Sequence, residues 1–410
     1  MALTRPIIRL NTLQLISPPE LPMKESDKPP YRVPSMAEIA AIPWNGFNAI
    51  STFSGCGGSS LGYKMAGFRV LWANEFIPAA QEVYRLNHPD TILNTKDIRQ
   101  IEPDEILEAI NMQPGQLDLF DGSPPCASFS TAGKREAGWG KVKAYSDTKQ
   151  RTDDLFFEYA RLVRGVQPKV FVAENVSGLV KGTAKGYFLE ILAALKDCGY
   201  NVTAKLLDAQ WLGVPQMRQR VIFMGVRKDL SAKAAYPRPL PYRYSVKDAL
   251  PWIVKQRHGK DFGEEEWIDA SQSPAQTVGT QQSSGNNINN GAYKVEAATD
   301  ISRFAIGAEW DRIGAGGQSD KYLQLTRPLI NGQSGTITAE GGNPSKAGVT
   351  HPTEKRKFSI AELKRICAFP DDFQLSGTYP QQWERLGRAV PPVMMSHIAA
   401  TIRDEVLCKL

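Results

Sequence analysis

The 410-residue sequence lacks a long hydrophobic run. No stretch of about eighteen consecutive apolar residues occurs, although a membrane-spanning helix needs roughly that length. The start, MALTRPIIRLNTLQL, also lacks the sustained apolar stretch and small-residue cleavage site of a secretion signal. These absences argue against a membrane or secreted protein, and they predict a cytoplasmic location.

Cysteine is scarce as well. The five cysteines, Cys56, Cys126, Cys198, Cys367 and Cys408, are widely scattered, and none belongs to a C-x-x-C pair. Closely spaced pairs mark zinc sites, and an even set in a short chain marks a disulfide framework. The sequence therefore predicts no metal site and no disulfide framework.

The composition fits a folded protein of more than one domain. Hydrophobic residues make up 42% of the chain, enough to fill the core of one large α/β domain and a smaller one. The formal net charge of +6 fits a polyanionic partner. A basic excess of this size also occurs in proteins that bind no nucleic acid, so the charge alone decides nothing.

Short β-rich segments alternate with amphipathic stretches between residues 47 and 226. The segments NAISTF, FRVLWANE, LDLFDG, VFVAENV and VIFMGV are typical of strands. Strands separated by helices favour an α/β fold with a mostly parallel, doubly wound sheet.

The flanking regions differ in texture and suggest four parts. Residues 1–45 are proline-rich, which favours an extended N-terminal extension. Residues 46–227 form the expected α/β domain, and residues 228–356 are polar and glycine-rich, which predicts a loop-rich, mostly β second domain. Residues 357–410 return to helical patterns, including a Ser359…Glu362 capping box and a helix entered through proline.

A glycine loop follows the first predicted strand. Gly55, Gly57 and Gly58 precede a predicted helix, where missing side chains let a ligand approach backbone N–H groups, although a tight structural turn has the same pattern. Glu75 ends the next strand about twenty residues further on, where an acid binds ribose hydroxyls in nucleoside-binding folds. Asp97 follows a third expected strand and could accept an adenine amino hydrogen. Either acid could instead be a solvated surface carboxylate.

Cys126 lies directly after an apolar strand. Pro124 and Pro125 stiffen the loop that carries it, as a nucleophile protruding from a sheet edge requires. The alternative is a buried, unreactive cysteine.

Several motifs together resemble one family. FSGCGGSSLG, SPPCASFS, Glu174-Asn175-Val176, Gln216-x-Arg218-x-Arg220 and GRAVPP occur in the order found in DNA cytosine-5 methyltransferases of the prokaryotic and phage type. The resemblance covers about residues 50–226 and 357–410. It implies a Rossmann-like, S-adenosylmethionine-dependent methyltransferase fold with a target-recognition domain inserted at 228–356. It further implies a monomer that acts on a cytosine flipped out of double-stranded DNA, as in restriction–modification systems.

The resemblance also implies roles for individual residues. The Cys126 thiolate would add to carbon 6 of cytosine, because carbon 5 is a poor nucleophile until an enamine forms. Glu174 would hold ring nitrogen 3 and the exocyclic amine, Arg220 would grip the carbonyl oxygen, and Arg218 would help to shape the site. The basic, glycine-containing segment between Cys126 and Leu155 would close over DNA.

The cofactor residues implied by the resemblance belong to the glycine loop, the two acids, the start of the cysteine loop and the last motif. They are Phe53, Ser54, Gly55, Cys56, Gly57, Gly58, Glu75, Phe76, Asp97, Ile98, Ser123, Pro125, Arg388, Ala389 and Val390.

One position departs from the family pattern. The last motif reads Gly387-Arg388-Ala389, with arginine where the family has asparagine. A fixed cation beside a sulfonium is unfavourable without an anionic partner. Arg388 could bind the carboxylate of carboxy-S-adenosylmethionine, which would make the product carboxymethylcytosine, or it could pair with a local acid or a DNA phosphate.

Two other functions are compatible with parts of the pattern. A catalytically silent DNA-binding protein could keep the fold, but the intact Cys126, Glu174 and Arg220 argue against it. A transfer-RNA cytosine methyltransferase would share several motifs, but the long 228–356 segment favours double-stranded DNA. Within that segment, Thr336 and Thr338 are candidates for reading bases.

Overall fold

The computed structural model describes residues 23–125, 143–145, 148–150, 152, 154–180, 184–253 and 299–410. Its centre is a seven-stranded sheet with strand order β3-β2-β1-β4-β7-β9-β8. The strands are β1 (Asn48–Thr52), β2 (Arg69–Asn74), β3 (Ile92–Asn94), β4 (Leu119–Gly122), β7 (Val170–Val176), β8 (Tyr200–Asp208) and β9 (Gln219–Arg227). From β3 to β7 all neighbours are parallel, whereas β9 runs antiparallel to both β7 and β8. The predicted α/β fold and its mostly parallel sheet are confirmed.

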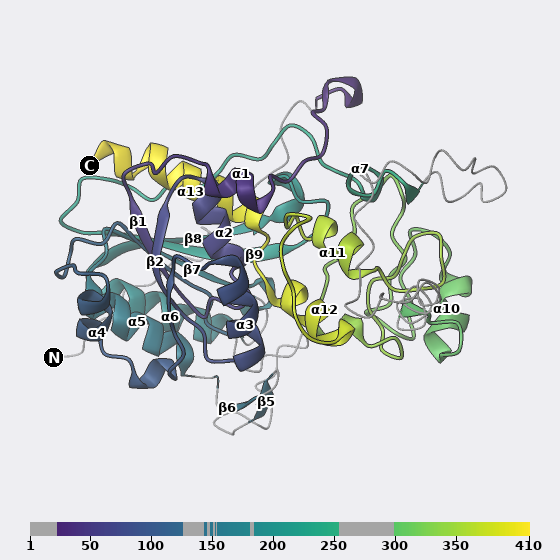
Figure 1. Cartoon of the computed structure of the whole chain (residues 1–410), viewed down its shortest axis with the longest axis horizontal. Coiled ribbons are helices and arrows are strands. Elements are labelled where there is room, and N and C mark those ends of the chain that lie inside the picture. The colour runs from purple at the N-terminus through teal and green to yellow at the C-terminus, as the bar shows by residue number, and fades with distance from the viewer. Residues whose placement is uncertain are drawn as a thin grey trace, which may run out of the picture.

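Helices cover both faces of this sheet (Figure 1). One face packs against α4 (Pro103–Ala109), α5 (Leu155–Val166) and α6 (Ala184–Asp197), and the other against α2 (Gly58–Met65) and α13 (Pro392–Glu405). The strands are apolar on both sides, as buried parallel strands must be. In β4, for example, Leu119 belongs to the core on the α13 side and Phe120 to the core on the α5 side.

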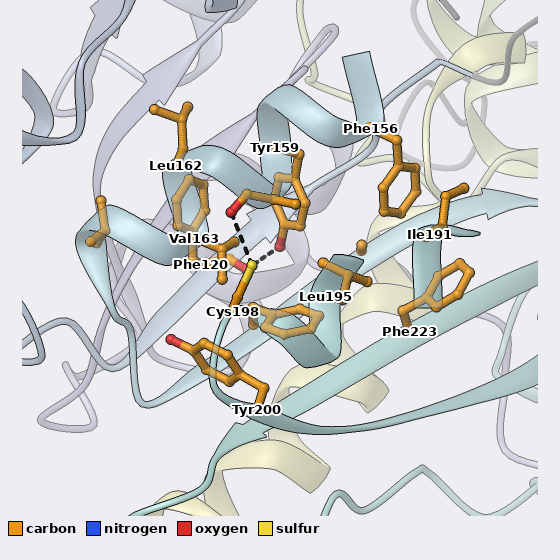
Figure 2. Close-up of a cluster of buried hydrophobic side chains, with 14 of the residues drawn as sticks. Phe120, Phe156, Tyr159, Leu162, Val163, Ile191, Leu195, Cys198, Tyr200 and Phe223 are labelled. Atoms are coloured by element: carbon orange, nitrogen blue, oxygen red, sulfur yellow. Dashed lines mark hydrogen bonds between the residues drawn. The ribbon is translucent and has the colours of Figure 1, made fainter. Parts of the chain in front are cut away.

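The core under α5 and α6 is rich in aromatic rings, as Figure 2 shows. Tyr159 is fully buried and donates its hydroxyl hydrogen bonds to the carbonyls of Phe120 and Val172, at 3.0 and 2.9 Å. The Cys198 thiol contacts the carbonyls of Ala160 and Ala194 at 3.3 and 3.2 Å. Buried polar atoms are thus satisfied in this cluster, and the sheet has a rigid base from which its carboxyl edge can present side chains.

Beside the sheet in Figure 1 lies a second lobe, formed by residues 246–253 and 299–356, which carries α7 (Val246–Ala249) and α10 (Ala305–Ile313). The helices α11 (Ile360–Ile366) and α12 (Tyr379–Arg388) lie between this lobe and the sheet. The predicted capping box is present, with Ser359 and Glu362 bonded reciprocally at the start of α11. Between 228–253 and 299–356 the chain is loop-rich, as expected. Its β pairing in these described residues consists of isolated bridges such as Gln318 with Thr326.

The N-terminal extension differs in part from the expectation. Residues 1–22 lie outside the described part of the chain, and residues 36–40 form a short helix, α1 (Met36–Ala40), instead of an extended arm. The reason is local: Ser35 and Glu38 form a capping box that begins a helix despite the preceding prolines. The Tyr31 hydroxyl donates to the Arg365 carbonyl at 2.6 Å, so the extension packs on α11.

Short elements complete the described chain. They are α3 (Pro78–Asn87), the hairpin β5 (Lys143–Tyr145) and β6 (Thr148–Gln150), and the 3₁₀ turns η1 (Glu25–Asp27), η2 (Ile98–Gln100), η3 (Ser177–Val180), η4 (Ala209–Trp211), η6 (Ala339–Gly342) and η7 (Leu407–Lys409). Among the described residues, no helix combines the length and the hydrophobicity that crossing a bilayer requires. The same residues contain no group of three or more side chains arranged to hold a metal ion.

Candidate active site

The predicted site residues follow neighbouring strands at one edge of the sheet. The glycine loop follows β1, Glu75 follows β2, Asp97 comes after β3, and Ser123 follows β4. Glu174 lies near the end of β7. Because parallel strands end at the same edge, the fold brings these residues to one place, as expected for a ligand site in a doubly wound sheet.

The glycine loop is tightly confined on two sides. Gly57 has φ +91° and is the N-cap of α2. A β-carbon added to Gly57 would lie 2.1 Å from Nε2 of His88, and one added to Gly58 would lie 2.3 Å from the Val390 carbonyl oxygen. Phe53, with φ +53°, also adopts the left-handed region that costs energy for a bulky residue. Glycine at 57 and 58 is therefore required by the packing of α3 and the last motif against the loop.

Glu75 is bonded directly to this loop. Its Oε2 accepts a hydrogen bond from the Gly55 amide at 2.7 Å, and its Oε1 accepts one from the Ile77 amide at 2.7 Å. The side chain is buried, and this burial raises the pKa of Glu75, although the two amides act in the opposite direction. Ser54 donates to the Ser51 carbonyl at 2.9 Å, which closes the other side of the turn.

Asp97 lies one strand further along the same edge. Its carboxylate accepts from the Arg99 amide at 3.0 Å and forms an ion pair with the Arg99 guanidinium at 3.0 Å. Arg99 also forms an ion pair at 2.6 Å with Asp154, the N-cap residue of α5. The Arg99 guanidinium therefore connects Asp97 to the start of α5. Ile98 is buried behind it, and Phe76 is half-buried next to Glu75.

The cysteine loop begins at the same edge. Ser123 donates its amide to the Thr52 carbonyl at 3.3 Å, and the Asn175 side-chain amide donates to the Pro124 carbonyl at 3.1 Å. Asn175 of β7 therefore fixes the start of the loop that carries the predicted nucleophile. Cys126 itself lies outside the described residues, as does most of the segment predicted to close over DNA, and Pro125 is the last residue described before it.

Glu174 and Arg220 form a buried ion pair. Nε of Arg220 lies 2.5 Å from Oε1 of Glu174, and both side chains are about nine-tenths buried. In the antiparallel register Val176 faces Arg220 and Glu174 faces Ile222, so the two charged residues are diagonal neighbours on one face. Burial lowers the pKa of Arg220, and Glu174 opposes this effect by stabilising the cation.

Arg218 has a different environment from Arg220. It is almost fully buried, and its terminal nitrogens donate to the carbonyls of Ile337 at 3.0 Å and of Gly387 and Ala389 at 2.9 Å each. Burial, together with the nearby charge of Arg220, lowers the pKa of Arg218 to about 9. The structure thus places Arg218 between the second lobe and the last motif, with Nη1 and Nη2 bonded to main-chain carbonyls and Nε buried without a hydrogen-bond partner among the described residues.

Arg388 lies at the end of α12 and is exposed. Its Nε donates to Oε1 of Glu384 at 2.7 Å, one helical turn earlier. The same carboxylate lies 3.2 Å from the buried Arg385. A local acid partner for Arg388 is therefore present. The Ala389 carbonyl accepts a hydrogen bond from Arg218, and the Val390 carbonyl lies next to Gly58.

Two charged residues near the site were not singled out from the sequence. Arg385 is buried, and its carbonyl accepts a hydrogen bond from the Cys56 thiol at 3.6 Å. Burial raises the pKa of the Cys56 thiol to about 12. Asp121, in β4, accepts hydrogen bonds from the Ser51 and Tyr63 hydroxyls at 2.9 and 3.0 Å. Burial raises its pKa to about 7. The acid inside the apolar segment LFDG was the available signal for Asp121.

Comparisons with known proteins show to which family the sequence belongs. A family model described as C-5 cytosine-specific DNA methylase matches residues 47–404. The type II methyltransferase M.NgoPII of Neisseria gonorrhoeae is 30% identical over 375 residues, which cover 90% of this chain and 99% of that relative. M.Sau96I of Staphylococcus aureus is 28% identical over 418 residues, which cover 98% of this chain and 88% of that relative.

Solved structures share the fold. A DNA modification methyltransferase encoded within a prophage of E. coli aligns with a TM-score of 0.62 at 24% identity, covering 88% of this chain and 99% of that one. The DNMT2 protein of Spodoptera frugiperda aligns with a TM-score of 0.56 at 16% identity, covering 86% and 98%. At these identities the likeness concerns the fold alone.

Proposed function

Because the chain belongs to the family of C-5 cytosine-specific DNA methylases, we propose that it modifies carbon 5 of a flipped-out cytosine in double-stranded DNA through a covalent Cys126 adduct. One observation carries the proposal. The buried pair joins Arg220 of β9 to Glu174 of β7, and the next residue of β7, Asn175, holds the start of the cysteine loop. An acid, a forked cation and a nucleophile-bearing loop at one sheet edge are what addition to a cytosine ring requires.

The residues of the first loop fit S-adenosylmethionine as the donor. Gly57 and Gly58 are packed against protein atoms, whereas a β-carbon at Gly55 would meet no atom within 4 Å. The open side of the loop therefore lies at Gly55, whose amide is bonded to Glu75. Glu75 would accept hydrogen bonds from ribose hydroxyls, and Asp97 one from an adenine amine. When bound, the cofactor supplies an electrophilic methyl group on its sulfonium.

The chain's own residues account for the remaining chemistry. The Cys126 thiolate forms a bond to carbon 6, and the electrons of the 5,6 double bond make carbon 5 nucleophilic. Glu174 holds ring nitrogen 3 and the exocyclic amine, and Arg220 holds the carbonyl oxygen, so the charge that develops on the ring is stabilised. After carbon 5 acquires its substituent, a base removes the carbon-5 proton and the bond from Cys126 breaks.

We propose a methyl group as the transferred carbon. Glu384 already balances the charge of Arg388 through an i,i+4 ion pair, so the arginine does not require a donor carboxylate as its counter-ion. Transfer of a carboxymethyl group from carboxy-S-adenosylmethionine would require Arg388 to break its ion pair with Glu384 and to form one with the carboxylate of the donor. Mass spectrometry of nucleosides from cells that supply both donors tests this choice: 5-methylcytosine alone is expected, and carboxymethylcytosine would contradict it.

The covalent step is tested by trapping. Incubation with S-adenosylmethionine and duplex DNA containing 5-fluorocytosine should give a protein–DNA adduct that survives denaturing electrophoresis, because fluorine blocks the final elimination. Cys126→Ala should give none. An adduct formed with transfer RNA and not with duplex DNA would favour a transfer-RNA methyltransferase, and DNA binding without any adduct would favour a silent DNA-binding protein.

A further inference from the structure

Arg218 joins two segments that are far apart in sequence. Its Nη1 bonds to the Ile337 carbonyl at 3.0 Å, and its Nη2 bonds to the carbonyls of Gly387 and Ala389. The side chain is 1% exposed, so these bonds are shielded from water. A planar guanidinium with several fixed donors can hold two segments at once, which a lysine ammonium on a flexible stem does poorly.

The Ile337 side of this bridge belongs to the second lobe. Ile337 lies between Thr336, whose hydroxyl donates to the Met217 carbonyl at 2.6 Å, and Thr338, whose carbonyl accepts from Trp383 at 2.9 Å. The Met217 amide donates to the Ser334 carbonyl at 2.8 Å. Residues 334–338, here called the recognition segment, are therefore bonded to Met217, the residue before Arg218, and to Trp383 of α12.

The other side of the bridge supports the glycine loop. Gly387 and Ala389 lie at the C-terminal end of α12, where a cation is favoured by the helix dipole. The next carbonyl, that of Val390, is so close to Gly58 that an added β-carbon would lie 2.3 Å from it. A displacement of residues 387–390 would therefore disturb the loop that is proposed to hold the cofactor.

We propose that Arg218 is a positioning residue that couples DNA binding to cofactor binding, an inference that rests on the proposed function. A ligand that fixes residues 387–390 also fixes the carbonyls that orient Arg218, and through Arg218 it orders the recognition segment. DNA bound at the recognition segment orders the glycine loop by the same path. Coupling of this kind is reciprocal, since each ligand must raise the affinity of the other by the same factor.

The coupling factor is measured with an unreactive product. The dissociation constant of a fluorescent duplex, carrying the site found modified in expressing cells, is measured with and without S-adenosylhomocysteine. The dissociation constant of S-adenosylhomocysteine is measured with and without the duplex. The wild type should show the same factor in both directions, between about 5 and 150. Arg218→Lys, which keeps the charge but not the fork, should lower the factor to below about 2 while each binary affinity changes by less than about threefold.

Arg227, the last residue of β9, provides a matched control far from Arg218, which directly precedes the start of that strand. Its Nη1 bonds to the carbonyls of Gly115 and Gln167, at 3.1 and 2.5 Å, so Arg227→Lys removes the same kind of bridge away from the site. This variant should keep the wild-type coupling factor. An unchanged factor in Arg218→Lys, no coupling in the wild type, or an equal loss in Arg227→Lys would each overturn the proposal.

A second measurement does not depend on a variant that folds. In the wild type, S-adenosylhomocysteine alone should slow amide hydrogen exchange in residues 334–338, and DNA alone should slow it in residues 55–58. Protection confined to each ligand's own side would refute the coupling. A wild type that binds no DNA, or that forms no fluorocytosine adduct, would instead refute the proposed function.

Discussion

At the scale of single residues, the site is organised by how its charges are paired. Glu174 and Arg220 neutralise each other in a buried position, and removing one partner leaves the other charge uncompensated. The pair lies at the carboxyl edge of the sheet. Asp118 and Lys169, which directly precede β4 and β7, form an ion pair at the opposite edge with Nζ 2.7 Å from Oδ1, although the Lys169 side chain is 33% exposed. Because the two ion pairs lie at opposite edges of the sheet, substitutions in each of them distinguish an effect on catalysis from an effect on stability.

Glu174→Gln should slow adduct formation by about 10²- to 10⁴-fold, because an amide cannot supply the carboxylate's share of proton transfer and charge stabilisation. Binding of S-adenosylhomocysteine should be unchanged, since the residues proposed to bind the ribose and the adenine follow β2 and β3. The rate is measured from the time course of fluorocytosine trapping. Asp118→Asn is the control: it should affect stability and leave the trapping rate near that of the wild type. Adduct formation at the wild-type rate in Glu174→Gln would remove Glu174 from the mechanism.

The sequence predicts that Glu174 and Arg220 bind the same cytosine, and this stays a prediction, whereas their contact with each other could not be predicted from the sequence. Glu174 and Arg220 are separated by 46 positions, and their pairing depends on the antiparallel register of β7 and β9. A one-residue slip would move Arg220 to the other face of the sheet. The carbonyl partners of Arg218 depend in the same way on where the second lobe meets α12, which no periodicity in the sequence encodes.

At the scale of elements, α1 and α11 are two of the helices that begin with a capping box, and they do so in different surroundings. Ser359 and Glu362 cap α11, and Ser35 and Glu38 cap α1. The sequence predicted only the first, because the prolines before residue 35 favoured an extended chain. β8 was also missed as a strand, since it is an edge strand with several partly exposed side chains and lacks the continuous apolar run of β7 and β9.

The capping boxes of α1 and α11 allow a matched comparison. Glu362 also binds Arg356 through both carboxylate oxygens, at 2.8 Å each, with its side chain 6% exposed. Glu38 pairs with Arg32 on the surface, with its side chain 49% exposed. Glu362→Gln should lower the free energy of unfolding by about 3 kcal/mol, because it breaks a buried pair, as measured by urea denaturation. Glu38→Gln should have a much smaller effect. Equal losses would show that the caps, and not the buried pair, stabilise these helices.

At the scale of the whole molecule, the C-terminal helix packs against the first helix that follows the glycine loop. α13, from the C-terminal part of the sequence, packs against α2 from the first loop, and Met395 fills the space beside Gly62. The second lobe is joined to this body through residues near Lys357, whose amide donates to the Thr299 carbonyl at 2.8 Å. The junction contains an unusual group, because the Lys357 side chain is fully buried and Nζ donates to the Lys346 carbonyl at 3.0 Å.

This lysine should make the stability of the molecule depend on pH. Burial lowers the pKa of Lys357 to about 7, whereas an unfolded chain has an ordinary lysine near 10.5. Between these values the unfolded state binds more protons, so the free energy of unfolding should rise with pH from about 7 towards 10, by at most about 1.4 kcal/mol per pH unit.

The substitution Lys357→Met removes this contribution. The variant should be more stable than the wild type near pH 7, and the difference should shrink as pH rises. Urea denaturation at pH 7, 8 and 9 measures the difference in the free energy of unfolding between the variant and the wild type. Lys346→Met is the control, because the Lys346 side chain is 55% exposed. A difference that stays constant over this range would mean that the amine of Lys357 is charged in the folded protein throughout.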